Sequence, residues 1–415
     1  MVFSGRFKRP ERLFYHLIMK MLTKSVAMSL LMLCIGLSAG CRQKSTESFN
    51  TEGAVRIQVP DRAYEPADLR DVFEGPVRMV PLETTAPSLI ANVEKVLYDA
   101  TEQLYFLMDT RMGRCVQIFS ADGRHVGAVK RIGRGPGEFD RPTDMSLDLS
   151  RWELHIYAQN SSKIIRNDYA GRYLDEQHVK YYPNDFAIHD GHYLLSMFNQ
   201  LVSLRHPRYN LYVTDYGFST PKGHFVQERD KEKYGDGPAF NLWPAWDGSV
   251  LYVPPHAARI YRIGHGDAVS LAYDVDFGTH ALPESFFREG YSEEQFFLER
   301  RNRTFAYDLT SLFENERYLI GSFTSGTTLC TFIYSKATGR TKVMAGLYAR
   351  LDTPVGYKPF GLNEADEVLW LVDARAFSAA ARRPDDIPDG TFKDFAARIS
   401  DADNPVMVWY KIKPF

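Results

Sequence analysis

Four charged side chains surround a glycine-rich run in the first third of the chain. Arg131, Arg134, Glu138 and Arg141 lie in or beside Gly-Arg-Gly-Pro-Gly at positions 133–137. The run is not a P-loop, because no Gly-Lys-Ser/Thr follows and no strand–helix–strand unit surrounds it. It is interpreted first as a turn between structural modules. In the alternative, these residues line a polar mouth, where the arginines would grip a carboxylate or sulfate through forked hydrogen bonds.

A second candidate site is aromatic. Trp243 and Trp246 lie close together in Asn-Leu-Trp-Pro-Ala-Trp at positions 241–246, and both rings could stack on sugars. The competing interpretation treats all the tryptophans as packing residues, because large rings fill the space between twisted sheets and bury much area. On that view they act as wedges together with the remaining tryptophans, which are Trp152, Trp370 and Trp409.

No catalytic motif accompanies these residues. The chain lacks the His-Glu-x-x-His zinc motif and the Gly-x-Ser-x-Gly nucleophile turn. His189 and His192 flank a predicted turn, and other histidines are scattered through the chain at 155, 206, 256, 265 and 280. No metal site is predicted, and the cofactor is left open. Acids near predicted strand ends could pair for glycoside cleavage: these are Asp144, Asp185, Asp274 and Glu367.

The N-terminus has the parts of an export signal. Lys20 and Lys24 precede an apolar run at 26–37, which is shorter than the about 20 residues a spanning helix needs. Small residues and Cys41 follow, as Leu-Ser-Ala-Gly-Cys, which resembles the lipobox of bacterial lipoproteins. The resemblance implies a signal peptide at 1–40, with the true start at Met19 or Met21, and a lipidated polar tether at 41–52.

The composition predicts a folded body after the tether. Of 415 residues, 44% are hydrophobic and 13% aromatic, which supplies ample core. The formal net charge of −2 gives no electrostatic footprint for nucleic acid, so no nucleic-acid partner is expected. Cys115 and Cys330 lie far apart in strand-like segments and are expected to be buried free thiols.

Short strands fill this body, and the turns between them recur at a regular period. The turn glycines Gly123, Gly171, Gly217 and Gly266 are separated by steps of 48, 46 and 49 residues, and Gly339 follows after 73. Steps of ~40–50 residues suit four-stranded propeller blades. An all-β, six-bladed β-propeller is therefore predicted over 53–415. A two-sheet sandwich remains the alternative. The predicted blades are 93–132, 142–179, 183–225, 240–277, 304–349 and 356–412.

Closure and insertions complete this prediction. The last blade is one strand short, and residues 77–82 are expected to supply its missing outer strand, since an open ring would leave unpaired edges. Two short helical insertions are expected near 281–304 and 374–404. In the first insertion, five apolar side chains are expected to face inward: Phe286, Phe287, Phe296, Phe297 and Leu298.

Three segments carry a resemblance to a known family. They are Val-Arg-Met-Val-Pro-Leu-Glu-Thr-Thr at 77–85, Gln-Ile-Phe-Ser-Ala-Asp-Gly-Arg at 117–124 and Ile-Gly-Arg-Gly-Pro-Gly-Glu-Phe at 132–139. Together they resemble the six-bladed β-propeller lipoproteins of Bacteroides-type bacteria, which are similar to NHL-repeat propellers. The resemblance is sharp over 77–180 and diffuse afterwards. It implies fold and compartment, and little about activity.

Two functions therefore stand as hypotheses. The first is a non-catalytic cell-envelope lipoprotein, anchored through Cys41, most plausibly in the outer membrane, with the facing leaflet left open. Its propeller would bind a glycan or protein ligand of an envelope uptake system, as the resemblance implies. The alternative is a propeller enzyme, a lyase or hydrolase, perhaps metal-dependent, that acts on an extracytoplasmic substrate such as a glycan. Three or more histidines or carboxylates converging on the channel would favour the enzyme, and an aromatic rim would favour binding.

Overall fold

A computed structural model describes residues 48–60, 69–197, 208–345 except 229, 232 and 236, 358–381 and 391–415. The chain divides into Met1–Ser48 and a compact unit, Phe49–Phe415. The leader, the lipobox cysteine Cys41 and most of the tether lie outside the described residues. Everything below concerns the second unit.

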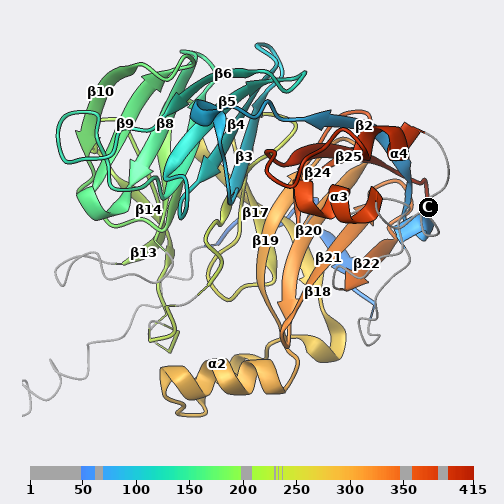
Figure 1. Cartoon of the computed structure of the whole chain (residues 1–415). Helices are drawn as coiled ribbons and strands as arrows, with labels where there is room; N and C mark the ends of the chain where they lie inside the picture. Colours follow the sequence, from blue (N-terminus) through green and yellow to red (C-terminus); the bar gives the residue numbers. More distant parts are fainter. Residues whose placement is uncertain are drawn as a thin grey trace, which may run out of the picture. The chain divides into compact units, whose positions relative to one another are not determined.

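Six separate sheets make up this unit, each with four strands in the order of a propeller blade (Figure 1). Blade 1 has β3 (Lys95–Asp99), β4 (Leu104–Asp109), β5 (Cys115–Ser120) and β6 (His125–Val129). Blade 2 has β7 (Asp144–Asp148), β8 (Glu153–Ala158), β9 (Lys163–Asp168) and β10 (Tyr173–His178). Blade 3 has β11 (Asp185–His189), β12 (His192–Ser196), β13 (Tyr209–Thr214) and β14 (Lys222–Val226).

The second half of the unit repeats this plan. Blade 4 has β15 (Leu242–Pro244), β16 (Val250–Tyr252), β17 (Arg259–Gly264) and β18 (Ala268–Asp276). Blade 5 has β19 (Ala306–Glu314), β20 (Tyr318–Ser325), β21 (Thr328–Ser335) and β22 (Thr341–Ala345). Blade 6 has β23 (Pro359–Leu362), β24 (Glu367–Val372), β25 (Val406–Ile412) and β2 (Phe73–Pro81). The predicted six-bladed propeller is confirmed.

The first strand of each blade lies innermost. Contacts run from β3 to β7, β11, β15, β19 and β23 and back to β3, so these six strands form a closed ring around the channel. We call the end of the channel where they begin the N-face and the end where they finish the C-face. Turns between first and second strands border the channel opening on the C-face, because they continue directly from the inner strands.

An N-terminal strand closes the ring, as predicted. β2 pairs antiparallel with β25, with Met79 opposite Val408 and Val80 opposite Met407. The neighbouring turn of blade 1 explains one recurring glycine. Gly123 has φ +85°, and a Cβ there would lie 2.3 Å from the Pro81 carbonyl oxygen. A strand that the sequence did not predict, β1 (Val55–Gln58), adds a fifth, parallel strand to blade 4 beside β18.

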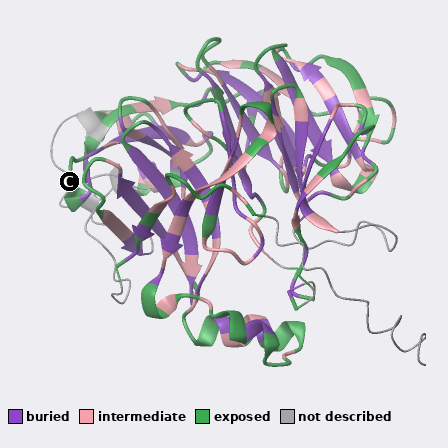
Figure 2. Ribbon diagram, turned by 180° about the vertical axis from the view of Figure 1, so that it is seen from behind, coloured by how far each residue is buried: buried purple, intermediate pink, exposed green. Residues whose placement is uncertain are grey.

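Buried apolar side chains fill the spaces between the blades, whereas exposed residues concentrate in the connections (Figure 2). Trp243, Trp370 and Trp409 are buried, as expected of packing residues. The same expectation is wrong for Trp152 and Trp246, which are 58% and 53% exposed. Both lie in turns beyond the strand ends, where no neighbouring sheet covers them. Cys115 and Cys330 are buried free thiols.

Three short helices interrupt the strands, at the two predicted insertions. They are α2 (Glu293–Asn302), α3 (Ala374–Ala381) and α4 (Thr391–Ala396). The single-turn 3₁₀ helices are Leu69–Asp71, Ala86–Ser88, Gln159–Ser161, His265–Asp267, Gly278–His280 and Glu284–Arg288. Figure 1 shows α3 and α4 beside β24 and β25, and α2 beyond the start of β19. Both insertions therefore belong to connections of the N-face.

Ser292 caps α2, because its hydroxyl accepts a hydrogen bond from the Gln295 backbone N–H. Three phenylalanines of this insertion form a small core with Tyr234, separate from the blade cores: Phe286, Phe287 and Phe296. The prediction that Leu298 faces inward is wrong, since its side chain is 44% exposed. Successive residues of a helix point about 100° apart, so 296, 297 and 298 cannot all face one side.

Candidate functional site

The glycine-rich run binds a carboxylate of its own chain. Glu138 Oε2 accepts a hydrogen bond of 2.8 Å from the Gly135 backbone N–H. A Cβ on Gly133 would lie 2.0 Å from the same oxygen, so only glycine leaves room for it. The backbone donors that could receive an outside anion are thus already shared with Glu138. Sequence patterns alone could not distinguish this internal anion from an external one.

Arg131 is also held by its own fold. Its guanidinium donates to the Gly137 and Gly171 carbonyl oxygens and to the Asn167 side chain. Gly171 and Asn167 belong to the outer half of blade 2, so the run joins blades 1 and 2 rather than the inner strands. Arg134 and Arg141 have exposed side chains. Their proposed role in gripping an anion stays a prediction.

The two aromatic candidates have different surroundings. Trp243 packs edge-on against Phe240 and Phe313, with ring centroids 6.0 and 5.5 Å away. Trp246 lies in the turn after β15, on the C-face, and the Lys336 ammonium lies 5.6 Å from its ring centroid. The structure therefore does not bring Trp243, Trp246 and the glycine-rich run into one site.

Exposed apolar side chains border the C-face opening instead. Tyr98 is at the end of β3, Leu149 and Trp152 lie in the turn between β7 and β8, and Trp246 lies between β15 and β16. These four side chains, which we call the rim, are 44 to 60% exposed. They come from blades 1, 2 and 4. Sequence analysis identified only Trp246 as a ligand candidate, because the position of a turn on the ring depends on the closure of all six blades.

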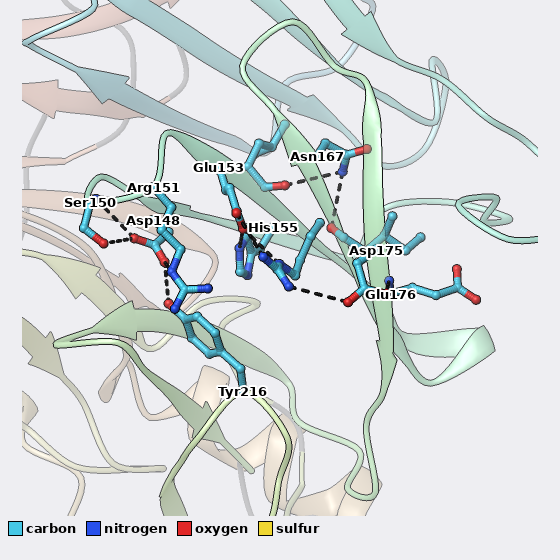
Figure 3. A network of polar contacts seen from close by, with 12 residues as sticks. Asp148, Ser150, Arg151, Glu153, His155, Asn167, Asp175, Glu176 and Tyr216 are labelled. Carbon is cyan, nitrogen blue, oxygen red and sulfur yellow. Dashed lines mark hydrogen bonds and ion pairs between the residues drawn. The ribbon is translucent and has the colours of Figure 1, made fainter.

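A polar network fixes the part of the rim on blade 2 (Figure 3). Asp148, the last residue of β7, accepts hydrogen bonds from the Ser150 hydroxyl and from Tyr216 Oη at 2.6 Å. Tyr216 belongs to blade 3, so the contact also locks two blades together. Blades 1 and 2 repeat it, since Tyr169 Oη donates to Asp99 at 2.9 Å. Burial, followed by the bond to Asp148, raises the pKa of Tyr216.

His155 lies deeper in the same network. Its Nε2 is 2.9 Å from Glu153 Oε2, and its Nδ1 is 2.8 Å from Tyr193 Oη. Arg166 donates to both Glu153 oxygens at 2.9 Å. Burial lowers the pKa of His155. Each of these groups is bonded to another protein group, so the network supports the rim as a rigid base.

Ionisable groups of the inner strands meet near the N-face. Lys95 Nζ donates to Asp144 Oδ1 at 2.6 Å, and the Phe186 backbone N–H donates to Asp144 Oδ2 at 2.8 Å. Asp185 Oδ2 accepts from the Asn241 and Leu242 backbones, whereas its buried Oδ1 has no hydrogen-bond partner.

Burial, with the nearby Asp144 charge, raises the pKa of Asp185 to about 7. Lys95, Asp144 and Asp185 are all buried. The ring of Phe240 from blade 4 lies 4.9 Å from the Lys95 ammonium of blade 1, so packed side chains cross the channel at this level. The other two candidate acids lie elsewhere: Asp274 is on the outer strand β18, paired with Arg259, and Glu367 is on β24.

The histidines do not converge. His189 and His192 lie on the turn between β11 and β12, where His192 faces Asp267 and His265 faces Asp190, whereas His256 contacts the Tyr234 carbonyl. His206 lies outside the described residues. In the part of the chain that the structure describes, no three histidine, cysteine or acidic side chains are grouped so that they could hold a metal ion.

Among the same residues, none of the helices has the length and apolar character that crossing a bilayer requires. The fold resembles two solved structures. An exported-class protein of Bacteroides fragilis matches with a TM-score of 0.72 and 17% identity, covering 86% of this chain and 100% of that one. A member of the DUF4221 family from Bacteroides vulgatus matches with a TM-score of 0.51 and 9% identity, covering 83% and 98%. At these identities, the matches show the fold alone.

No curated protein matches the chain. A family model does match, over residues 55–411, which include all six blades and the strand that closes them. The chain therefore belongs to the family of the domain of unknown function DUF4934.

Proposed function

We propose that this protein is a lipid-anchored protein of the cell envelope whose propeller binds a ligand or partner, without catalysis, at the C-face rim. The observation that carries this proposal is the exposure of Tyr98, Trp152 and Trp246 around the opening. Large aromatic side chains are costly to leave in water, and they supply the flat apolar surface on which sugars and protein partners pack. Positive charge accompanies them, since Arg151 and Lys336 lie nearby.

The enzyme alternative would have to use Asp144 and Asp185, since a carboxyl with a raised pKa can act as a general acid. Both side chains are buried, and backbone N–H groups or Lys95 hold three of their four oxygens. Such groups stabilise the junctions between inner strands. Binding at the exposed rim therefore has the better support.

Variants of the rim test the proposal. The full-length protein, its Trp152→Ala/Trp246→Ala double variant and a Leu298→Ala control would be recovered from envelopes of the producing cells, and co-purifying glycans and proteins identified by mass spectrometry. Leu298 is a suitable control, because it is exposed on α2 at the opposite face. We expect a ligand that the wild type and the control retain and the double variant loses. If all three carry the same set of molecules, the rim is not the binding surface.

The anchor has a separate test. Cys41 follows an apolar leader and small residues, as a lipidated cysteine does, and a stable lipid anchor needs more than one acyl chain. We expect Cys41→Ala to leave the propeller folded and to release it from the membrane fraction. A variant that stays with the membranes would refute lipid anchoring at this residue without affecting the proposal for the rim.

A further inference from the structure

Arg300 is a buried cation with unused hydrogen-bond donors. It lies on α2, it is only 3% exposed, and neither its Nε nor its Nη1 has a hydrogen-bond partner. A guanidinium has five N–H donors, and burying it is unfavourable unless acceptors replace water. The nearest carboxylate oxygen, Asp308 Oδ1, is 3.7 Å from Nη1, which is too far for a hydrogen bond.

Aromatic rings cover the flat faces of this guanidinium. Its Cζ lies 3.7 Å from the ring centroid of Tyr307 and 5.1 Å from that of Phe297. Such stacking stabilises the charge but uses none of the N–H groups, which point outward in the guanidinium plane. The in-plane donors are therefore the part of Arg300 that lacks a partner.

The other half-buried arginines of the fold differ in this respect. Arg262 donates to both oxygens of Glu314 at 2.8 and 2.7 Å, and Arg166 donates to both oxygens of Glu153. These pairs show how this fold normally satisfies a guanidinium. Arg300 has the same burial requirement without the matching acid.

The charges around Arg300 do not offset this. Burial lowers the pKa of His256 to about 4, and the charges of Arg300 and Lys231 lower it further, so this imidazole is neutral at pH 7. Lys231 has acids of its own, since its ammonium lies 2.9 Å from Glu284 and 3.2 Å from Glu228. The region beneath α2 thus holds positive charge and hydrogen-bond donors that fit a negative oxygen ligand.

We propose that Arg300 is the anchor of an anion-binding site beneath α2, on the N-face, which takes a carboxylate or sulfate group. The guanidinium would donate to the ligand oxygens through the nitrogens that now lack partners. The site is independent of the rim, because it lies at the opposite end of the channel and uses none of the same residues.

Neighbouring arginines on α2 provide a matched pair of variants. Arg300→Met removes the buried charge, whereas Arg301→Met removes an exposed one. The thermal midpoint of the full-length protein would be measured with increasing sodium sulfate or sodium glucuronate, with sodium chloride holding the ionic strength constant. The two probes distinguish a free inorganic anion from a carboxylate carried on a sugar.

For the wild type and Arg301→Met, we expect a saturable rise of several degrees with at least one probe. Arg300→Met should lack this rise, and it should melt higher than the wild type in chloride alone, because an unpaired buried charge is gone. Sulfate also stabilises proteins without binding a site, so the difference between the variants decides. An equal rise in Arg300→Met, or no rise in the wild type with either probe, would overturn the proposal.

A second measurement on the wild type does not depend on the variant's folding. The charge of Arg300 lowers the pKa of His256, so a bound anion should raise that pKa, which NMR of the imidazole ring can follow. An unchanged His256 titration at saturating concentrations of both probes would also contradict the proposed site.

Discussion

Single side chains in this fold take their chemical character from burial, and Asp185 is the clearest case. Its folded-state pKa is about 7, against ~3.9 for an exposed aspartate. A carboxyl with a raised pKa contributes stability that is fully present below pH ~4 and is lost as the pH rises through about 7. This sign is opposite to that of a salt-bridged aspartate.

We therefore expect Asp185→Asn to lose less free energy of unfolding than the wild type between pH 5 and pH 8, measured by urea denaturation. Asp175→Asn, an exposed residue of β10, should keep the wild-type difference. An identical pH dependence in the wild type and Asp185→Asn would mean that Asp185 is ionised in the folded protein throughout this range.

The same dependence on surroundings limits what residue types can predict. Arg131 and Glu138 have the chemistry to bind an anion, but both bond to their own fold. Arg300 looked like an ordinary solvent-facing helix residue in the sequence, yet it is buried. Which of two arginines keeps free donors depends on contacts with residues far away in the chain, and no local pattern records those contacts.

At the scale of elements, repeated contacts between blades hold the ring together. Tyr216→Phe removes the donor to Asp148 and leaves its carboxylate one bond short. We expect a loss of about 1.5–3 kcal/mol in the free energy of unfolding, since bonds to charged groups are worth this much. Tyr182→Phe, on an exposed ring, should change it by less than about 0.5 kcal/mol. Equal effects of the two variants would show that this contact does not stabilise the junction.

The closing strand gives the second prediction at this scale. A chain that begins at Glu83 lacks β1 and β2, so the edge of β25 loses its partner. A chain that begins at Leu69 lacks only β1. We expect the shorter chain to aggregate or unfold, and the longer one to stay monomeric, by size-exclusion chromatography and circular dichroism. If both chains stay monomeric and folded, β2 is not required for closure.

Elements were also where sequence patterns worked best. The turn glycines repeat because each blade needs a similar turn against its neighbour, as Gly123 does against Pro81. The closing strand could be predicted because the last blade lacked one. β1 was missed, because a four-residue strand on the outside of a complete blade repeats nothing. The Leu298 error came from counting apolar residues without fixing the helical phase.

At the scale of the whole molecule, closure of the ring creates the candidate site. Tyr98, Trp152 and Trp246 are more than 50 residues apart in the sequence, and only the arrangement of the inner strands places their turns around one opening. The fold could therefore be predicted from local repeats, whereas the rim could not. Family membership adds the fold and its extent, and the chemistry must come from these exposed side chains.

The central claim is that the rim is occupied in the native envelope. Hydroxyl-radical footprinting, read by mass spectrometry, would compare the protein in intact envelopes with the purified protein. We predict that Tyr98, Trp152 and Trp246 are oxidised several-fold less in envelopes, while Tyr182 and Leu298, exposed outside the rim, are oxidised equally in both. Equal oxidation of the rim residues in the two preparations would contradict the claim.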